Sequence, residues 1–213
     1  MDFGKAFTFV FDDPDWLKKI AINSLIGLIP IVGQIYVMGW GLEVARRIAV
    51  GSGQPLPDVD FGIYLGYGFK AFVVALVYTA PIWVLSIIVA GLSALLYEVS
   101  QDAANAIGLI VGLCFGSFGI IYGLLMGVMM PAALTRMVVF GSIKDGLAFG
   151  NVWGMVRKVP GAYLLVLVGT FAAGLLAGIV GGIACGIGAF FTMTWYQAVM
   201  GHLYGQAYQA AGA

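Results

Sequence analysis

Charged residues are scarce in this sequence, and their scarcity argues against a soluble protein. Lys and Arg number 10, Asp and Glu number 10, and together they make up 9% of the 213 residues. A soluble domain has about 25% charged residues. Hydrophobic residues make up 62% of the chain, so we expect membrane lipid to be its solvent. The charge is balanced and has no dense basic run, so we expect no nucleic-acid partner.

Histidine and cysteine are almost absent, which removes the residue types of most catalytic and metal sites. His202 is the single histidine, and the two cysteines allow neither a disulfide framework nor a zinc site. The apolar runs lack the paired titratable groups that acid–base catalysis needs. No phosphate-binding loop of the G-x-x-x-x-G-K-[ST] type is present. We therefore expect no enzyme, no catalytic residue, no metal and no cofactor.

Glycine, by contrast, is abundant, with 32 residues. The uncharged stretch from Gly108 to Gly127 is about 20 residues long, enough to cross a bilayer core. Its glycines recur every four residues, a spacing that lets helices approach closely. Packing within the monomer and self-association through a lipid-facing stripe both fit this pattern. The predicted helix-packing residues are Gly108, Gly112, Gly116, Gly119, Gly123, Gly127, Gly174, Gly178, Gly182 and Gly186.

The N-terminal third contains an interrupted apolar run. Residues 1–12 alternate aromatic and polar side chains and are interpreted as an interfacial segment, with Asp13 as the N-cap of the next helix. Within Ile20–Ala45, Pro30 and Gly33 predict a helix break. The run is either one kinked span or a re-entrant hairpin, and we prefer the re-entrant or strongly broken form.

Three amides in apolar surroundings are the candidate contacts for a solute or ion. Asn23 and Gln34 flank the predicted break, and Gln197 lies in the last apolar segment. Buried polar groups are costly in lipid, and broken transporter helices expose backbone groups that bind substrates. The alternative is that the amides satisfy the broken backbone or bridge helices.

The rest of the chain predicts an all-α, polytopic membrane helical bundle. It has about four full spans, the N-terminal hairpin and amphipathic connecting segments. Glu98–Asn105 is interpreted as a short acidic turn, and Gly181-Gly182 as the turn before a last span over 183–204. We expect one integral membrane domain over 1–213. A shift of 88 residues aligns eight identities over 39–70, which suggests an internal repeat of about 20–97 and 106–180.

Basic residues predict the topology. Lys and Arg concentrate in the two connecting segments and are absent from the turn at 98–105, so the connecting segments are expected to face the cytoplasm. Glu43 precedes Arg46 and Arg47 by three and four residues, the spacing of a same-face ion pair. The predicted cytoplasmic boundary comprises Glu43, Arg46, Arg47, Lys70, Arg136, Arg157 and Lys158.

The segment FDDPDWLKKI, followed by GLIPIVGQIYVMGW, Arg46-Arg47 and then QPLPD at 54–58, resembles a family of prokaryotic integral membrane proteins. That family is known as domain of unknown function 4013. The resemblance covers residues 11 to about 72 well and the remainder only as glycine-rich helices. It implies a multi-span protein of the cytoplasmic membrane of a prokaryote, with no activity or functional residue to transfer.

Two functions remain open from the sequence. The first is a non-catalytic membrane protein that uses close helix packing, with itself or with lipid as partner, to build an assembly or shape the membrane. The second is a small channel or transporter that uses the break at Pro30–Gly33. Lipid-exposed glycine faces favour the first, and a polar cavity lined by Asn23, Gln34 and Gln197 favours the second.

Overall fold

The computed structural model describes residues 1–52, 56–99, 101–183 and 187–212. The chain is 88% helical, and the described residues contain no strand, which confirms the predicted all-α class. The elements are α1 (Phe3–Thr8), η1 (Phe9–Asp12, a 3₁₀ turn), α2 (Trp16–Gly27), α3 (Val32–Ala49), α4 (Phe61–Val99), α5 (Gln101–Phe140), α6 (Ile143–Gly146), α7 (Phe149–Lys158), α8 (Pro160–Ile183) and α9 (Ile187–Ala210).

The helices form two compact units. Unit 1 comprises Met1–Val74 and Val128–Ala213, and unit 2 comprises Ala75–Gly127. Unit 1 therefore holds the beginning of α4, the end of α5 and all the other elements. Unit 2 holds only the second part of α4 and the first part of α5.

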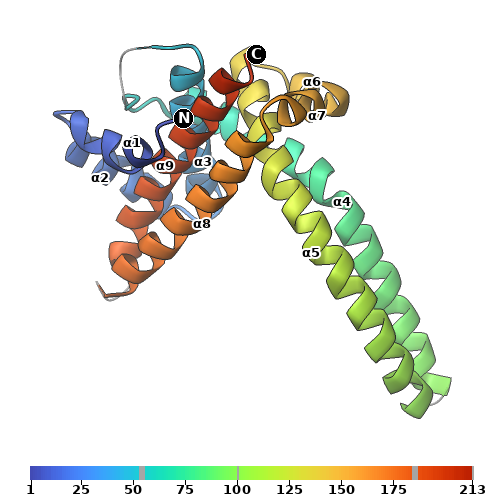
Figure 1. The fold of residues 1–213 in the computed structure, drawn as a ribbon. Helices are drawn as coiled ribbons and strands as arrows, with labels where there is room; N and C mark the ends of the chain where they lie inside the picture. The colour runs from blue at the N-terminus through green and yellow to red at the C-terminus, as the bar shows by residue number, and fades with distance from the viewer. Residues whose placement is uncertain (53–55, 100, 184–186, 213) are drawn as a thin grey trace. The chain divides into compact units, whose positions relative to one another are not determined.

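Unit 2 is a helical hairpin whose two arms lie side by side (Figure 1). Each arm has roughly 25 residues and spans about 38 Å at 1.5 Å per residue, longer than a hydrocarbon core of about 30 Å. Its apolar side chains are largely exposed, among them Trp83, Ile87, Leu113 and Ile120. Tyr122 in α5 donates a hydrogen bond from its hydroxyl to the carbonyl of Tyr78 in α4 and joins the arms.

Three described helices are long and apolar enough to cross a membrane: Phe61–Leu95, Gly108–Phe140 and Pro160–Ile183. They support the membrane class and match the expected span number only roughly. The last predicted span, 183–204, falls largely in α9, which does not meet the same criterion. Its first residue, Ile183, ends α8, and residues 184–186 lie outside the described part of the chain.

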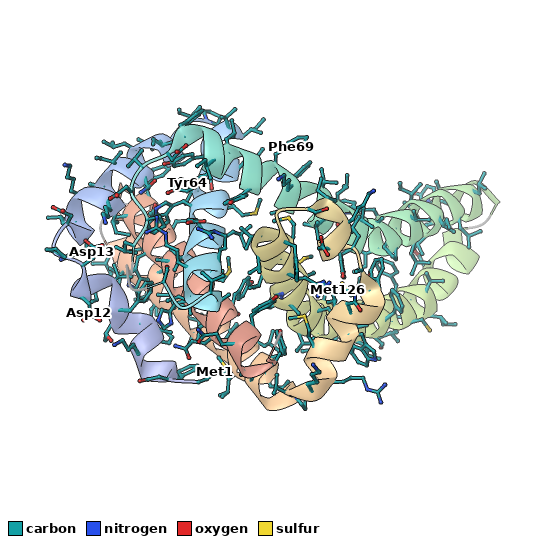
Figure 2. All side chains as sticks on the ribbon, turned by 90° about the horizontal axis from the view of Figure 1, so that it is seen from above. Met1, Asp12, Asp13, Tyr64, Phe69 and Met126 are labelled. Atoms are coloured by element: carbon teal, nitrogen blue, oxygen red, sulfur yellow. The ribbon has the colours of Figure 1, made fainter. Side chains whose placement is uncertain are left out.

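Unit 1 has a core in which α3 packs against α9 and α2. Trp40 and Tyr36 of α3 are fully buried, beside Tyr64 of α4 (labelled in Figure 2) and Leu56 of the preceding loop. The Trp40 indole N–H donates to the carbonyl of Pro57 at 3.3 Å. Helices α8 and α9 also pack on each other (Figure 1). Aromatic side chains thus fill much of the core of unit 1.

Glycines bring the backbones of unit 1 into direct contact. A methyl group added at Gly41 of α3 would lie 2.8 Å from the Gln197 carbonyl oxygen of α9, closer than a real Cβ lies to any neighbour. Gly201 and Gly205 of α9 meet the carbonyls of Gly41 and Ala45 in the same manner. Gly39 of α3 faces the Tyr64 carbonyl in α4, and Gly68 of α4 faces the Ile35 carbonyl in α3.

The N-terminal segment, for which an interfacial position stays a prediction, is partly buried in unit 1. Its residues Phe9 and Val10 are 2% and 0% exposed and belong to the core of unit 1. The predicted N-cap is wrong in position, because α2 begins at Trp16 after Asp15. Asp13 Oδ1 still accepts from the Asp15 N–H at 2.9 Å, while Asp13 Oδ2 pairs with Lys19 at 2.9 Å.

Two predicted turns are helical. Helix α4 continues to Val99 and α5 begins at Gln101, so residue 100, outside the described residues, is all that separates them. Gly181 and Gly182 lie within α8, which continues to Ile183. A Cβ at Gly181 would meet the Cα of Ala189 in α9 at 2.8 Å, so this glycine serves helix packing and not a turn.

Candidate functional site

The helix break lies where Pro30 and Gly33 predicted it. Helix α2 ends at Gly27 and α3 starts at Val32. Ile31 has a φ of 65°, a left-handed conformation that is rare for a branched residue and costs about 1–3 kcal/mol. Gly33 lies against the backbone of α2, where an added Cβ would overlap the Ile26 carbonyl oxygen. The absence of a side chain at Gly33 therefore permits this close return of the chain onto α2.

Two of the three candidate amides are used inside the protein. Asn23 is fully buried, donates from Nδ2 to the Lys19 carbonyl at 2.7 Å, and accepts from the Tyr36 hydroxyl at 2.7 Å. Burial raises the pKa of Tyr36 to about 12, so its hydroxyl stays a donor at neutral pH. Gln34 donates from Nε2 to the Gly27 carbonyl at 2.9 Å and satisfies the end of α2. These contacts agree with the alternative in which the amides support the broken backbone.

Gln197 has a different environment. Its side-chain Oε1 is buried and has no hydrogen-bond partner. Its backbone carbonyl is the group that Gly41 approaches. The structure therefore does not bring Gln197 together with Asn23 and Gln34 around one polar site.

A small cavity lies beside the break. It measures about 220 Å³ and is lined by Ser24, Gly27, Gln34, Val37, Phe190 and Thr194, among others. The Ser24 hydroxyl donates to the Ile20 carbonyl at 2.7 Å and lies within hydrogen-bond distance of Thr194 Oγ1 at 2.9 Å, so these polar groups are already occupied. Most of the lining is apolar. Of the three candidate amides, Gln34 alone is among the lining residues.

The ion pair predicted for Glu43 is present. Its carboxylate accepts from Arg46 Nε at 2.7 Å and from Arg47 Nε at 3.0 Å, and its side chain is 6% exposed. Burial alone would raise the pKa of Glu43, but the hydrogen bonds and charges of the two arginines hold it below its ordinary value. The carboxylate is therefore ionised at neutral pH and cannot act as a proton donor.

A second charge cluster was not predicted. Lys19 contacts Asp13 at 2.9 Å and Asp58 at 3.2 Å, and its ammonium also donates to the Leu56 carbonyl at 3.1 Å. Burial opposes the charge of Asp13 (labelled in Figure 2), yet the bonds from Lys19 and from the Asp15 N–H lower its pKa. The cluster ties α2 to the loop before α4. The sequence holds no spacing signal for it, since Lys19 and Asp58 are far apart in the chain.

His202 is buried and lacks an acidic partner within hydrogen-bond distance among the described residues. Its ring is 5% exposed, stacks on Phe9 at 4.3 Å between centroids, and its Nδ1 lies 2.9 Å from Gln206 Nε2. Burial first, and the charge of Lys5 second, lower its pKa to about 4, with Asp2 opposing. It is therefore neutral at physiological pH and serves packing at the N-terminal segment.

The predicted glycine stripes lie outside the packed interfaces. A Cβ at Gly108, Gly112, Gly116, Gly119 or Gly123 would meet nothing within 4 Å, and the same holds for Gly178 and Gly182. Gly174 has only the ring of Tyr196 at 3.6 Å. The prediction of packing within the monomer is therefore wrong for the seven open glycines, whereas Gly174 does contact α9. Gly186 lies outside the described residues.

The remaining boundary residues occupy separate places in unit 1. Lys70 donates from Nζ to the Gly141 carbonyl at 2.8 Å, and Arg136 lies 3.4 Å from Asp145. Arg157 and Lys158 are exposed on α7. They form no ion pair among the described residues. These residues do not converge on one pocket.

Comparison with known proteins yields one finding. A family model described as "Protein of unknown function (DUF4013)" matches residues 22–186. No curated protein and no solved structure matches the chain.

Proposed function

This chain belongs to the DUF4013 family of proteins of unknown function, and from its geometry we propose that it is a non-catalytic assembly protein of a prokaryotic cytoplasmic membrane. In this proposal, copies of the chain associate in the bilayer through unit 2. One observation carries it: a Cβ added at Gly108, Gly112, Gly116, Gly119 or Gly123 on one face of α5 would meet nothing within 4 Å.

The open glycines share one side of their helix. At 100° per residue, the six glycines from Gly108 to Gly127 fall within a sector of about 100°. Tyr122, which bonds to α4, points outside this sector by the same geometry. The glycine face is therefore next to the hairpin contact and is not covered by it. A second copy is the occupant we propose, because a smooth backbone surface fits another helix more closely than it fits a flexible lipid tail.

The described serine hydroxyls of unit 2 are already used within their own helices. The hydroxyls of Ser86, Ser93 and Ser117 donate to the carbonyls of Ile82, Val89 and Leu113 on their own helices. Association between hairpins would therefore depend on van der Waals packing, for which small residues permit the closest approach of two backbones.

The channel or transporter alternative has weaker support. Its one favourable feature is the cavity beside Ser24 and Gln34. Hydrogen bonds within the chain occupy the Asn23 side chain on both its donor and acceptor sides, and Gln34 donates to the end of α2. Few polar groups remain to replace the hydration shell of a solute.

Subunit counting in lipid tests the proposal. The full chain is reconstituted into vesicles at decreasing protein-to-lipid ratios, and copies are counted by stepwise photobleaching. We expect more than one copy per assembly for the wild type. Gly112→Leu/Gly116→Leu should yield single copies with an unfolding temperature that does not fall, since a Cβ added at either position would meet nothing within 4 Å among the described residues.

Ser117→Leu is the matched control, because it adds bulk to the same helix about 130° from the centre of the glycine face. Its assembly should match that of the wild type. Single copies of the wild type at every ratio would contradict the proposal. Equal loss of assembly in the control would also contradict it.

A further inference from the structure

The short helix α7 occupies a special place in the chain. It lies in the connection between α5, which ends at Phe140, and α8, which begins at Pro160. Both α5 and α8 include segments long and apolar enough to cross a membrane. A connection of roughly 20 residues between two such segments is held close to one membrane surface by its two ends.

One face of α7 is committed to the protein. Val152, Met155 and Val156 are 0%, 4% and 5% exposed. Met155 packs with Tyr208 and Ala211 at the end of α9. This face fixes the orientation of the helix and determines which side chains point outward.

The outer face is cationic and carries the exposed aromatic side chains of Phe149 and Trp153. Trp153 is 41% exposed, and Arg157, one turn later, lies on the same side of the helix. Lys158 adds a second exposed charge. Gly150 and Gly154 lie between these residues, and an added Cβ at either would meet nothing within 4 Å, so the surface is flat and accessible.

Acidic groups do not neutralise this face. The single acid between Phe140 and Pro160 is Asp145, and it pairs with Arg136 at 3.4 Å. Arg157 and Lys158 take part in none of the ion pairs formed by the described residues. The outer face therefore keeps its positive charge for a partner outside the chain.

We propose that the outer face of α7 docks on anionic phospholipid headgroups of the membrane that holds the neighbouring helices. Arg157 and Lys158 bind the phosphates, and the amphipathic ring of Trp153 lies at headgroup level. The adjoining segments bring this face to the bilayer, which favours a lipid surface over an acidic protein. The inference concerns lipid recognition by unit 1 and does not depend on association through unit 2.

Hydrogen exchange of the full chain in nanodiscs tests this proposal. Amide exchange over 149–158 is compared in zwitterionic bilayers and in bilayers with about 30% phosphatidylglycerol. We expect slower exchange in the anionic bilayer. Since a basic residue near an anionic surface changes a binding equilibrium by about fivefold, Arg157→Gln/Lys158→Gln should remove the difference. High salt should reduce the difference in exchange between the two bilayers for the wild type.

Lys5→Gln/Lys18→Gln is the matched control, because it removes two exposed charges from other elements of unit 1. In this variant, α7 should still exchange more slowly in the anionic bilayer than in the zwitterionic bilayer. The proposal is overturned if α7 exchanges at the same rate in both bilayers, or if the control loses the dependence as fully as the α7 variant. Trp153→Ala should weaken protection in the anionic bilayer and retain its salt dependence.

Discussion

Units 1 and 2 use the same residue, glycine, in opposite ways. In unit 1, Gly39, Gly41 and Gly201 lie against carbonyl groups of neighbouring helices, and no side chain would fit. In unit 2, Gly112 and Gly116 face open space although their spacing is more regular. The spacing of glycines along a helix therefore identifies a surface that permits close packing. It does not identify which surface is packed within the chain.

The units also differ in how they treat polar groups. Unit 1 buries Asn23, Glu43 and His202, each with partners that compensate for lost water. The span segments of unit 2, 75–97 and 108–127, carry no Asp, Glu, Lys, Arg or His. Unit 1 thus resembles the interior of a folded domain, whereas unit 2 depends on its surroundings for burial. Four experiments sharpen this contrast, in order of expected effect.

The largest effect is expected from a single methyl group at Gly39. Gly39→Ala places a Cβ on the Tyr64 carbonyl, so α3 and α4 must separate. We expect the free energy of unfolding in detergent to fall by about 3 kcal/mol. Gly116→Ala adds the same group in open space and should raise it by roughly 0.5–1 kcal/mol, because alanine favours the helix.

Thermal and denaturant unfolding of the two variants measure this difference. If Gly39→Ala does not fold, Gly41→Ala offers a milder contact, 2.8 Å from the Gln197 carbonyl oxygen. Equal effects of the changes in unit 1 and unit 2 would contradict the contrast between closed and open glycines.

The next effect is a pH dependence that belongs to unit 1. Burial lowers the pKa of His202 to about 4 in the folded protein, from the ordinary histidine value of 6.5 that applies to the unfolded chain. Between pH 4 and pH 6.5 the histidine is protonated in the unfolded chain but not in the folded protein. The free energy of unfolding therefore has its full value above pH 6.5 and falls as the pH falls toward 4. The free energy of unfolding falls by about 3 kcal/mol between pH 6.5 and pH 4.

His202→Gln should flatten the unfolding free energy between pH 6.5 and 4.5. Below this window the lowered pKa values of Asp13 and Glu43 give a further loss, since those carboxylates must be protonated. The separation of the unit 2 arms, followed by a pair of fluorescent labels, should not respond in the same window. A slope that survives in His202→Gln would assign the pH dependence to another group.

A smaller effect is expected at Glu43. Glu43→Gln removes the charge shared by Arg46 and Arg47, and burial makes this loss greater than at a surface pair. Because Arg46 is 35% exposed, water compensates in part, and we expect about 2 kcal/mol of destabilisation. Lys5→Gln is the control, because its pair with Asp12 is exposed and 4.0 Å long. Chemical denaturation compares them, and equal losses would contradict the assigned role of burial.

The elements that local chemistry determines were predictable from the sequence. Pro30 removes a helix hydrogen bond and Gly33 permits a close return, so the break appears where the two residues lie. The Glu43 ion pair follows from helical geometry alone. The apolar runs predicted the membrane class for the same reason, since length and composition are local properties.

The features that failed depend on tertiary partners. Gly181-Gly182 has turn-forming residues, but packing against Ala189 keeps α8 helical. Asp13 accepts from the Asp15 N–H as an N-cap would, but α2 begins only at Trp16, and Lys19 binds the second carboxylate oxygen. Asn23 faces Tyr36, a partner that no periodicity identifies. In each case a contact between distant residues overrides a local preference.

The smallest effect is expected inside the hairpin of unit 2. Tyr122→Phe removes the hydroxyl that bonds to the Tyr78 carbonyl and leaves the ring in place. Hydrogen bonds between membrane helices contribute about 0.6 kcal/mol on average, so the hairpin should weaken by no more than about 1 kcal/mol. Ser117→Ala is the control, because its hydroxyl bonds only within its own helix. Single-molecule unzipping of the hairpin in bicelles measures both. A loss for Tyr122→Phe above 2 kcal/mol would mean that polar contacts, and not helix packing, hold unit 2 together.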